Sequence, residues 1–180
     1  MRWAPRISAL AAILLLGCGD GTTEIPIVNA GFEAPVKRAG EIPGWTVIQH
    51  AGPPSYETAI DTKTRSEGAA SFRIRRIREQ VYGSIFQRVP VANLAGKTVE
   101  LSAMLKTEDV GDKGWILQLT QTSGSVDRVS AAPLTGTTDF TRVTLKAKIL
   151  AGTREVEIAA SLRDGGTAWI DAVHLRVTDP

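Results

Sequence analysis

The segment 167–177, with the sequence TAWIDAVHLRV, places apolar residues at intervals of two. Successive side chains of a β-strand point to opposite faces of its sheet, so this period predicts a strand with one buried face. Asp171 is the only charged residue on that face, and a carboxylate directed toward a core requires a partner or a metal ion. The face predicted to be buried consists of Trp169, Asp171, Val173, Leu175 and Val177.

The same alternation recurs along most of the chain. Glycine-rich turn clusters, such as those at 111–114 and 164–166, separate the alternating segments, and no helical period is visible after residue 18. About nine or ten short strands predict one all-β domain, a two-sheet antiparallel β-sandwich of jelly-roll type, with a barrel as the less favoured alternative. The segments expected to form strands are 25–28, 45–50, 56–61, 70–76, 84–89, 98–106, 115–121, 142–149, 155–162 and 167–177.

The first residues have the composition of an export signal. Arg2 and Arg6 precede an apolar run at 7–16 that is too short to span a membrane as a mature helix. The run ends in LLGC, which resembles a bacterial lipobox, a signal in which the cysteine becomes the acylated first residue of the mature protein. An ordinary secretory signal with a chance cysteine is the alternative. Cys18 is the only cysteine, which excludes an internal disulfide and suits a lipid anchor.

These signals divide the chain into three parts: a lipoprotein signal peptide at 1–17, a lipidated cysteine with a short tether at 18–24, and the β-sandwich at 25–180. Within the lipobox resemblance, Gly19 after the cysteine favours the outer membrane of a bacterial cell envelope. The chain has 21 basic and 19 acidic residues, and removal of the signal peptide takes away two arginines. The mature chain is therefore neutral, which gives no support for nucleic-acid binding.

Four sequence blocks, taken in order, resemble a carbohydrate-binding module of the galactose-binding-domain-like jelly-roll superfamily, of the type appended to bacterial cellulases and xylanases. Together they span nearly the whole mature chain. The resemblance implies that the domain binds a poly- or oligosaccharide without modifying it. The blocks are VNAGFE with PGW at 28–45, EGAASFRI at 67–74, FQRVPV with GKTVELSAMLKTEDV at 86–110, and GTTDFTRVTL with GGTAWIDAVHL at 136–175.

The resemblance also implies a structural calcium ion where the first and last strands meet. The matching side chains are Glu33 and Asp171, and carbonyl oxygens near 67–69 would complete the site by analogy. Calcium takes 6–8 oxygen ligands, carboxylate and carbonyl mixed, so the chemistry is consistent with this set. The alternative is that both carboxylates accept hydrogen bonds from loop backbone or an arginine, with no metal.

Sugar binding in such modules lies on the concave sheet face or in the loops at one edge. Sugars are recognised by flat aromatic faces and by amide, carboxylate or guanidinium groups. Tyr82, Gln118, Arg75 and Trp115 are the candidates, although Trp115 shares the parity of the apolar residues that follow it, which favours core packing over a place at the rim of the site. For Tyr82 the alternative is loop packing, and for Gln118 and Arg75 it is an ordinary solvent-facing position.

Catalytic signatures are absent from the sequence. There is no HExxH metal motif, no G-x-S-x-G turn and no phosphate-binding glycine loop, and the only thiol is assigned to lipid. We therefore expect a lipid-anchored envelope protein that binds carbohydrate and is not an enzyme. The alternative function is an envelope scaffold or protein-partner-binding module on the same fold, without a sugar site.

Overall fold

The computed structural model describes residues 22–38 and 40–178. These residues form strands and no helix, so no helix in this part is long and apolar enough to cross a membrane. The strands are β1 (Thr23–Ile25), β2 (Thr46–Gln49), β3 (Tyr56–Asp61), β4 (Ser71–Arg76), β5 (Gly83–Pro90), β6 (Thr98–Ser123), β7 (Ser125–Ser130), β8 (Leu134–Lys148), β9 (Glu155–Leu162) and β10 (Thr167–Thr178).

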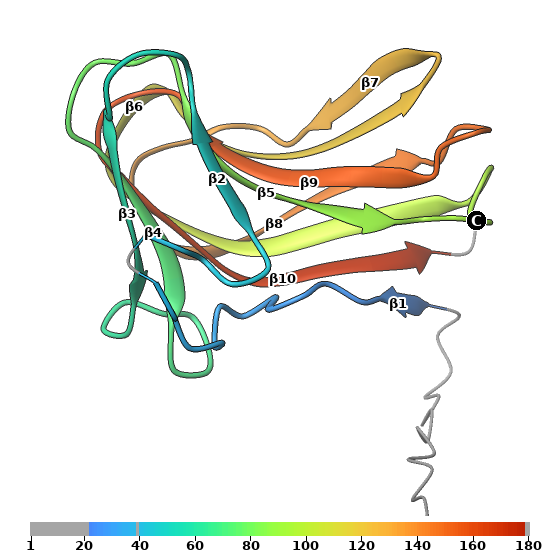
Figure 1. The fold of residues 1–180 in the computed structure, drawn as a ribbon, viewed down its shortest axis with the longest axis horizontal. Helices are drawn as coiled ribbons and strands as arrows, with labels where there is room; N and C mark the ends of the chain where they lie inside the picture. Colours follow the sequence, from blue (N-terminus) through green and yellow to red (C-terminus); the bar gives the residue numbers. More distant parts are fainter. Residues whose placement is uncertain (1–21, 39, 179–180) are drawn as a thin grey trace, which may run out of the picture.

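The long strand β6 takes part in both layers of the fold. Its first half pairs with β10 and β8, and its second half pairs with β9 and β7. One layer, the first sheet, has the order β2-β5-β9-β6-β7; the second sheet contains β8-β6-β10-β4-β3, with β1 beside β10. All pairs are antiparallel, and Figure 1 shows β7 and β9 above β10 and β1. The predicted antiparallel jelly-roll sandwich is therefore confirmed.

Two predicted strands, 98–106 and 115–121, are parts of this one strand of 26 residues. The turn cluster between them bends the strand but does not end it. Asp109 (φ 53°) and Gly114 (φ 72°) adopt left-handed conformations, and the register with β8 shifts over the same stretch. Such irregularities bend a strand while pairing continues on either side.

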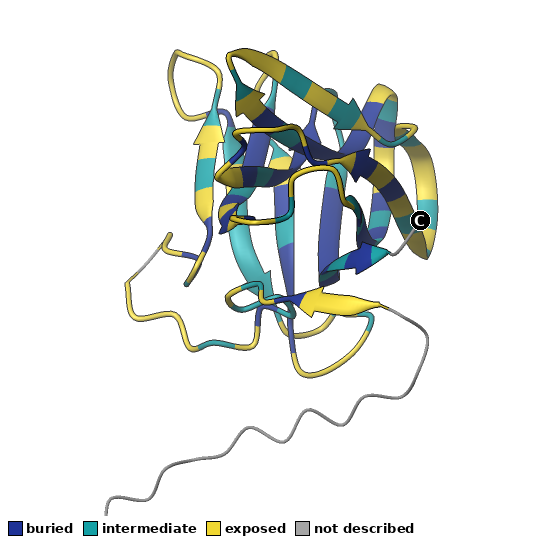
Figure 2. Cartoon of the chain, turned by 90° about the vertical axis from the view of Figure 1, so that its right-hand side faces the viewer, coloured by how far each residue is buried: buried dark blue, intermediate teal, exposed yellow. Residues whose placement is uncertain are grey.

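The core lies between the two sheets and is built from alternate residues of the strands. In Figure 2 the buried positions, in dark blue, concentrate on strands in the centre of the molecule, and the loops are largely exposed. Phe32 comes from the loop after β1 and packs between Trp45 and Phe72, with ring centroids 5.2 and 5.9 Å away. These three rings pack at the edge of the core, beside the loop that follows β1.

A β-bulge in β10 changes the face assignment made from the sequence. Between Asp171 and His174 the strand advances three residues while β6 advances two, and Ala172 adopts φ 48°. The residues before the bulge that face the core are therefore Ala168 and Ile170, not Trp169. Trp169 is buried, as predicted, but on the outer side of the second sheet, where its indole N–H donates to Asp61 Oδ2 over 3.0 Å.

The first strand begins earlier than the sequence suggested. It was predicted at 25–28, but β1 covers Thr23–Ile25 and pairs with the end of β10. Pro26 has no N–H to donate to a ladder, which explains why pairing stops there. The end of the predicted tether at 18–24 thus belongs to the sheet, and Cys18 lies outside the described residues.

Candidate functional site

The outward face of the first sheet carries the candidate site. Along β9, Val156, Ile158, Ala160 and Leu162 face the core, so Glu157, Ala159 and Ser161 face the other way. The same alternation on β5 and β6 exposes a second set of side chains to this face, because neighbouring strands are in register.

Two adjoining hollows on this face share Thr120 and Glu157; we call them together the groove. The second hollow, of about 420 Å³, extends past β9 to Arg88 and Arg154. The first hollow, of about 170 Å³, is lined by Ile48, Tyr82, Ser84, Phe86, Gln118, Thr120, Arg128, Glu157, Ala159, Ser161 and Arg163.

A row of hydrogen-bonded side chains crosses the floor of the groove. Ser84 and Ser161 lie directly opposite each other on β5 and β9, and their hydroxyls are 2.9 Å apart. The Ser161 hydroxyl donates to Gln118 Oε1 over 3.1 Å, and Gln118 Nε2 donates to the Ser130 hydroxyl on β7 over 2.9 Å. Four strands thus contribute to one row. Mutual hydrogen bonds of this kind fix the orientation of each group, which is what selective recognition of hydroxyls requires.

Aromatic rings lie at one end of the groove, where Tyr82 and Phe86 are both partly exposed. The Tyr82 ring meets His50 edge-on, with centroids 6.0 Å apart, and its backbone carbonyl accepts the His50 N–H. Exposed Ile48 lies beside them in the groove lining. This end therefore offers apolar and aromatic surface next to the polar floor, a combination that suits the two faces of a sugar ring.

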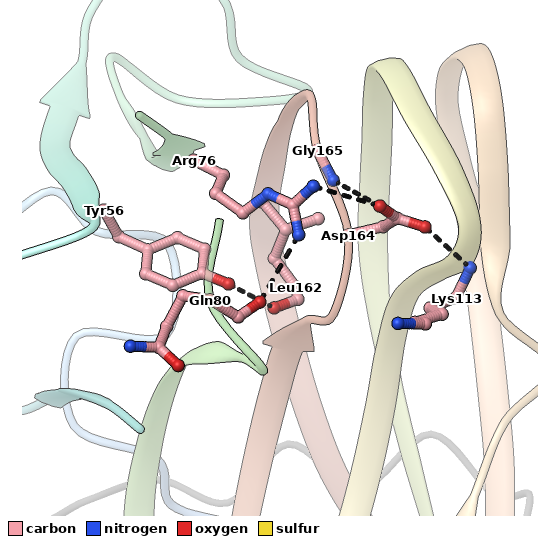
Figure 3. A network of polar contacts seen from close by, with 7 residues as sticks. All are labelled: Tyr56, Arg76, Gln80, Lys113, Leu162, Asp164 and Gly165. Carbon is pink, nitrogen blue, oxygen red and sulfur yellow. Dashed lines mark hydrogen bonds and ion pairs between the residues drawn. The ribbon is translucent and has the colours of Figure 1, made fainter. Parts of the chain in front are cut away.

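A polar network behind the groove fixes the strand ends that carry these groups (Figure 3). The Tyr56 hydroxyl donates to Leu162 O over 3.3 Å, and the Tyr56 ring lies against Gly83, where a Cβ would come within 2.6 Å of it. Because Gly83 pairs with Leu162, Tyr56 contacts β5 and β9 at the same level. Burial raises the pKa of Tyr56, opposed by the nearby Arg76 guanidinium.

The same network holds the turn between β9 and β10. Asp164 accepts the N–H groups of Gly165 and Lys113 and forms an ion pair of 3.1 Å with Arg76. Those backbone N–H groups, with a smaller contribution from Arg76, hold the pKa of Asp164 below its usual value. The turn is thereby fixed to β4 and to the bend of β6, which places the neighbouring Arg163 at the groove.

Two of the four predicted ligand-binding residues, Tyr82 and Gln118, lie in the groove, and two do not. Trp115 is fully buried, and its indole N–H donates to Trp169 O over 3.0 Å, so the prediction of a rim platform is wrong and the alternative of core packing is correct. Arg75 lies on β4 in the second sheet and forms an exposed ion pair with Glu57.

Most groove residues were not singled out from the sequence, among them Ser84, Ser161, Arg128 and Arg163. The alternation indicated which residues of each strand face outward. It did not indicate that β5, β9 and β6 are neighbours, since these pairings join positions far apart in the chain. Ser84 and Ser161 are 77 residues apart, yet their hydroxyls are in contact.

Glu33 and Asp171 both lie beside Gly31, so their carboxylates are near each other, as the calcium prediction requires. An ideal Cβ at Gly31 would lie 4.0 Å from both Glu33 Oε1 and Asp171 Oδ1. Oxygens of both carboxylates accept N–H groups of one loop: Asp171 Oδ2 from Ser66 and Glu67, and Glu33 Oε1 from the two residues after Gly68.

These hydrogen bonds satisfy the burial of Asp171 without a metal ion, which is the alternative considered from the sequence. The described residues include no group of three or more His, Cys, Asp or Glu side chains suited to a metal. Loop carbonyl oxygens would have to supply most of the ligands that calcium needs. Calcium binding at Glu33 and Asp171 therefore stays a prediction.

Comparisons with known proteins relate the fold to solved structures. Neither a protein-family model nor a curated protein matches the sequence. The xylan-binding domain CBM22-1 of Paenibacillus barcinonensis Xyn10C matches 84% of this chain and 93% of its own, with 14% identity and a TM-score of 0.57. TmCBM61, solved with β-1,4-galactotriose, matches 85% of this chain and 98% of its own, with 17% identity and a TM-score of 0.56.

A third similar structure is the enzymatically active domain of tailspike protein 4 from bacteriophage CBA120, with 14% identity and a TM-score of 0.64. It is matched over 76% of this chain, which spans only 20% of the tailspike chain. At these identities the similarity shows the fold alone, the jelly roll of carbohydrate-binding modules.

Proposed function

We propose that this domain binds a poly- or oligosaccharide in the groove of the first sheet and does not modify it. The observation that carries the proposal is the hydrogen-bonded row across four strands, flanked by the partly exposed rings of Tyr82 and Phe86. Amide and hydroxyl groups match sugar hydroxyls, and aromatic faces match the apolar faces of sugar rings. The similar fold of two carbohydrate-binding modules, one solved with a galactotriose, supports the proposal.

The hydrogen-bonded polar floor indicates that the groove is a built site and not an incidental hollow. Gln118 and Ser161 are buried although they point away from the core. Both polar atoms of the Gln118 side chain, Oε1 and Nε2, have a side-chain partner. A ligand would meet groups already oriented, so little side-chain entropy is lost on binding.

The test is a binding panel of soluble and insoluble plant, bacterial and host polysaccharides, measured by affinity electrophoresis and pull-down. Loss of a stacking ring or of the central amide removes about 1–2 kcal/mol of binding, so Tyr82→Ala and Gln118→Ala should bind about tenfold more weakly. Arg75→Ala, on the second sheet, is the control and should bind as the wild type does. Unfolding temperatures identify any variant that has lost its fold.

Binding that survives both groove variants would place the ligand elsewhere on the molecule. Absence of binding across the whole panel would contradict the proposal and favour the protein-partner-binding alternative.

We infer binding without catalysis because the acids of the groove are engaged. Glu155 and Glu157 both lie near the Arg88 guanidinium, with N–O distances of 3.8 and 3.5 Å. A glycosidase needs two free carboxyl groups flanking the scissile bond, and the described lining of the groove offers no acid other than these two, each with Arg88 as a neighbour. Incubation of bound polysaccharides with the protein should release no reducing ends.

The proposal includes a lipid anchor at Cys18, supported by the sequence LLGC after an apolar run. The anchor would hold the groove at the surface of a bacterial envelope membrane, with the outer membrane favoured by Gly19. Cys18→Ser should move the protein from the membrane fraction to the soluble fraction after cell lysis. Unchanged membrane retention would contradict the anchor and leave the sugar-binding proposal untouched.

A further inference from the structure

The cations of the groove are all arginines, and they outnumber its acids. Its two hollows are lined by four arginines and two glutamates. Both glutamates neighbour one arginine, Arg88. Within residues 22–38 and 40–178, Arg128, Arg154 and Arg163 form no ion pair. Four arginines against two glutamates give this face a local positive excess, although the mature chain is neutral by composition.

Two of these arginines lie at different ends of the first hollow. Arg163 follows β9, where its backbone N–H donates to Gly114 O, and it is half-buried. Arg128 stands on β7 opposite Thr120, which itself pairs with Glu157. Arg163 lies six residues after Glu157, which corresponds to about 20 Å along an extended chain. The two guanidinium groups can therefore contact different units of one extended ligand.

The floor and the arginines differ in how many of their hydrogen-bonding groups remain unpaired and could bind a ligand. Ser84, Ser161 and Gln118 already bond to one another, whereas Arg128 uses only Nε, which donates to the Thr120 hydroxyl over 3.0 Å. Its terminal nitrogens, and the whole guanidinium of Arg163, have no described partner. A guanidinium presents five N–H donors in a planar fork that matches a carboxylate in a bidentate pair.

We propose that the ligand of the groove is an acidic polysaccharide, with sugar carboxylates paired to Arg163 and Arg128. This inference rests on the proposed function and narrows the ligand to one class of polysaccharide. Arginine rather than lysine is the residue suited to this pairing, because its donors are fixed in geometry and its charge is weakly hydrated.

The experiment compares each acidic polymer with its own neutral form. Glucuronoxylan, polygalacturonate and alginate are each tested beside the same polymer after carboxyl reduction, using the purified full chain. At least one acidic polymer should bind about thirtyfold more tightly than its reduced form, because the pair with Arg163 contributes about tenfold and the exposed pair with Arg128 about threefold. The difference should shrink as salt is raised above about 0.15 M, where screening acts over about 8 Å.

Arginine variants test the assignment of residues. Arg163→Gln should weaken binding of the acidic polymer about tenfold, and exposed Arg128→Gln about threefold, with no change for the reduced polymer. Arg163→Lys keeps the charge and loses the planar fork, so it should retain salt dependence but bind more weakly than the wild type. Arg75→Gln, an exposed arginine of the second sheet, should have no effect.

Equal binding of the acidic and reduced polymers would overturn the acidic-ligand inference while the proposed sugar-binding function stands. Binding of dextran sulfate as tight as that of the carboxylated polymers, and undiminished in both glutamine variants, would also overturn it, since it would reflect general attraction of polyanions. Failure to bind any polymer, acidic or neutral, would contradict the proposed function itself.

Discussion

Substitution of Asp171 by asparagine tests how the loop after β3 is held to the last strand. Asp171 Oδ2 accepts three hydrogen bonds, from the N–H and hydroxyl of Ser66 and the N–H of Glu67, at 2.9, 2.9 and 3.2 Å. Oδ1 accepts the N–H of Ala172 at 2.8 Å. An asparagine has one acceptor oxygen, and the loss is smallest when that oxygen takes the place of Oδ2.

In that orientation the asparagine amide group faces the N–H of Ala172, which loses its acceptor. A buried N–H without a partner costs about 1–3 kcal/mol, and the three remaining bonds lose their charge assistance. The free energy of unfolding should therefore fall by about 3 kcal/mol. For a domain of this size the melting temperature should fall by about 6–12 °C.

The assay is thermal unfolding followed by calorimetry in the presence of a chelator, so that no metal contributes. Glu33→Gln is the matched control: the N–H groups of Ala69 and Ala70 both bond to Oε1, and a single amide oxygen can keep both. Its cost should be about 1 kcal/mol. A melting temperature of Asp171→Asn within 2 °C of the wild type (about the shift expected from under 1 kcal/mol), or equal destabilisation of Glu33→Gln, would show that Asp171 does not hold the loop in this way.

Three further outcomes are expected. Because the folded-state pKa of Asp164 is lowered, its contribution to stability is present at neutral pH and lost as pH falls below about 4, so Asp164→Asn should destabilise the protein at pH 7 and converge with the wild type in acid titrations of unfolding. Gly83→Ala should cost about 1–3 kcal/mol in denaturant unfolding, since the new Cβ would lie 2.6 Å from the Tyr56 ring; unchanged stability would mean that Tyr56 moves freely. If Glu33 and Asp171 hold calcium, a chelator should lower the wild-type melting temperature and leave Asp171→Ala unaffected, and a wild type indifferent to chelator would end the calcium prediction.

The parity of strand residues was predictable because burial repeats every two positions. Trp115 is an example: its parity with Leu117 and Leu119 indicated core packing, and the structure buries all three. The bulge at Ala172 was not predictable, because alanine carries no preference for a positive φ and nothing else in the segment signals one. One extra residue moved Trp169 to the opposite face.

Prediction of the groove would have required the strand pairing, which local sequence patterns do not contain. Gln118 and Tyr82 were found because their side chains are typical of sugar sites. Ser84 and Ser161 join them only through the pairing of β5 with β9 and of β9 with β6. A short serine side chain on an outward position carries no signal of its own, and its role follows from its neighbours across the sheet.

The most direct test of the central proposal is an NMR titration of isotope-labelled protein with an oligosaccharide of the polymer that binds best in the panel. We expect the largest amide shifts on Tyr82, Ser84, Gln118 and Ser161, with no comparable shifts on β3 or β4. Saturable shifts confined to the second sheet or to the loop at 66–70 would contradict binding in the groove.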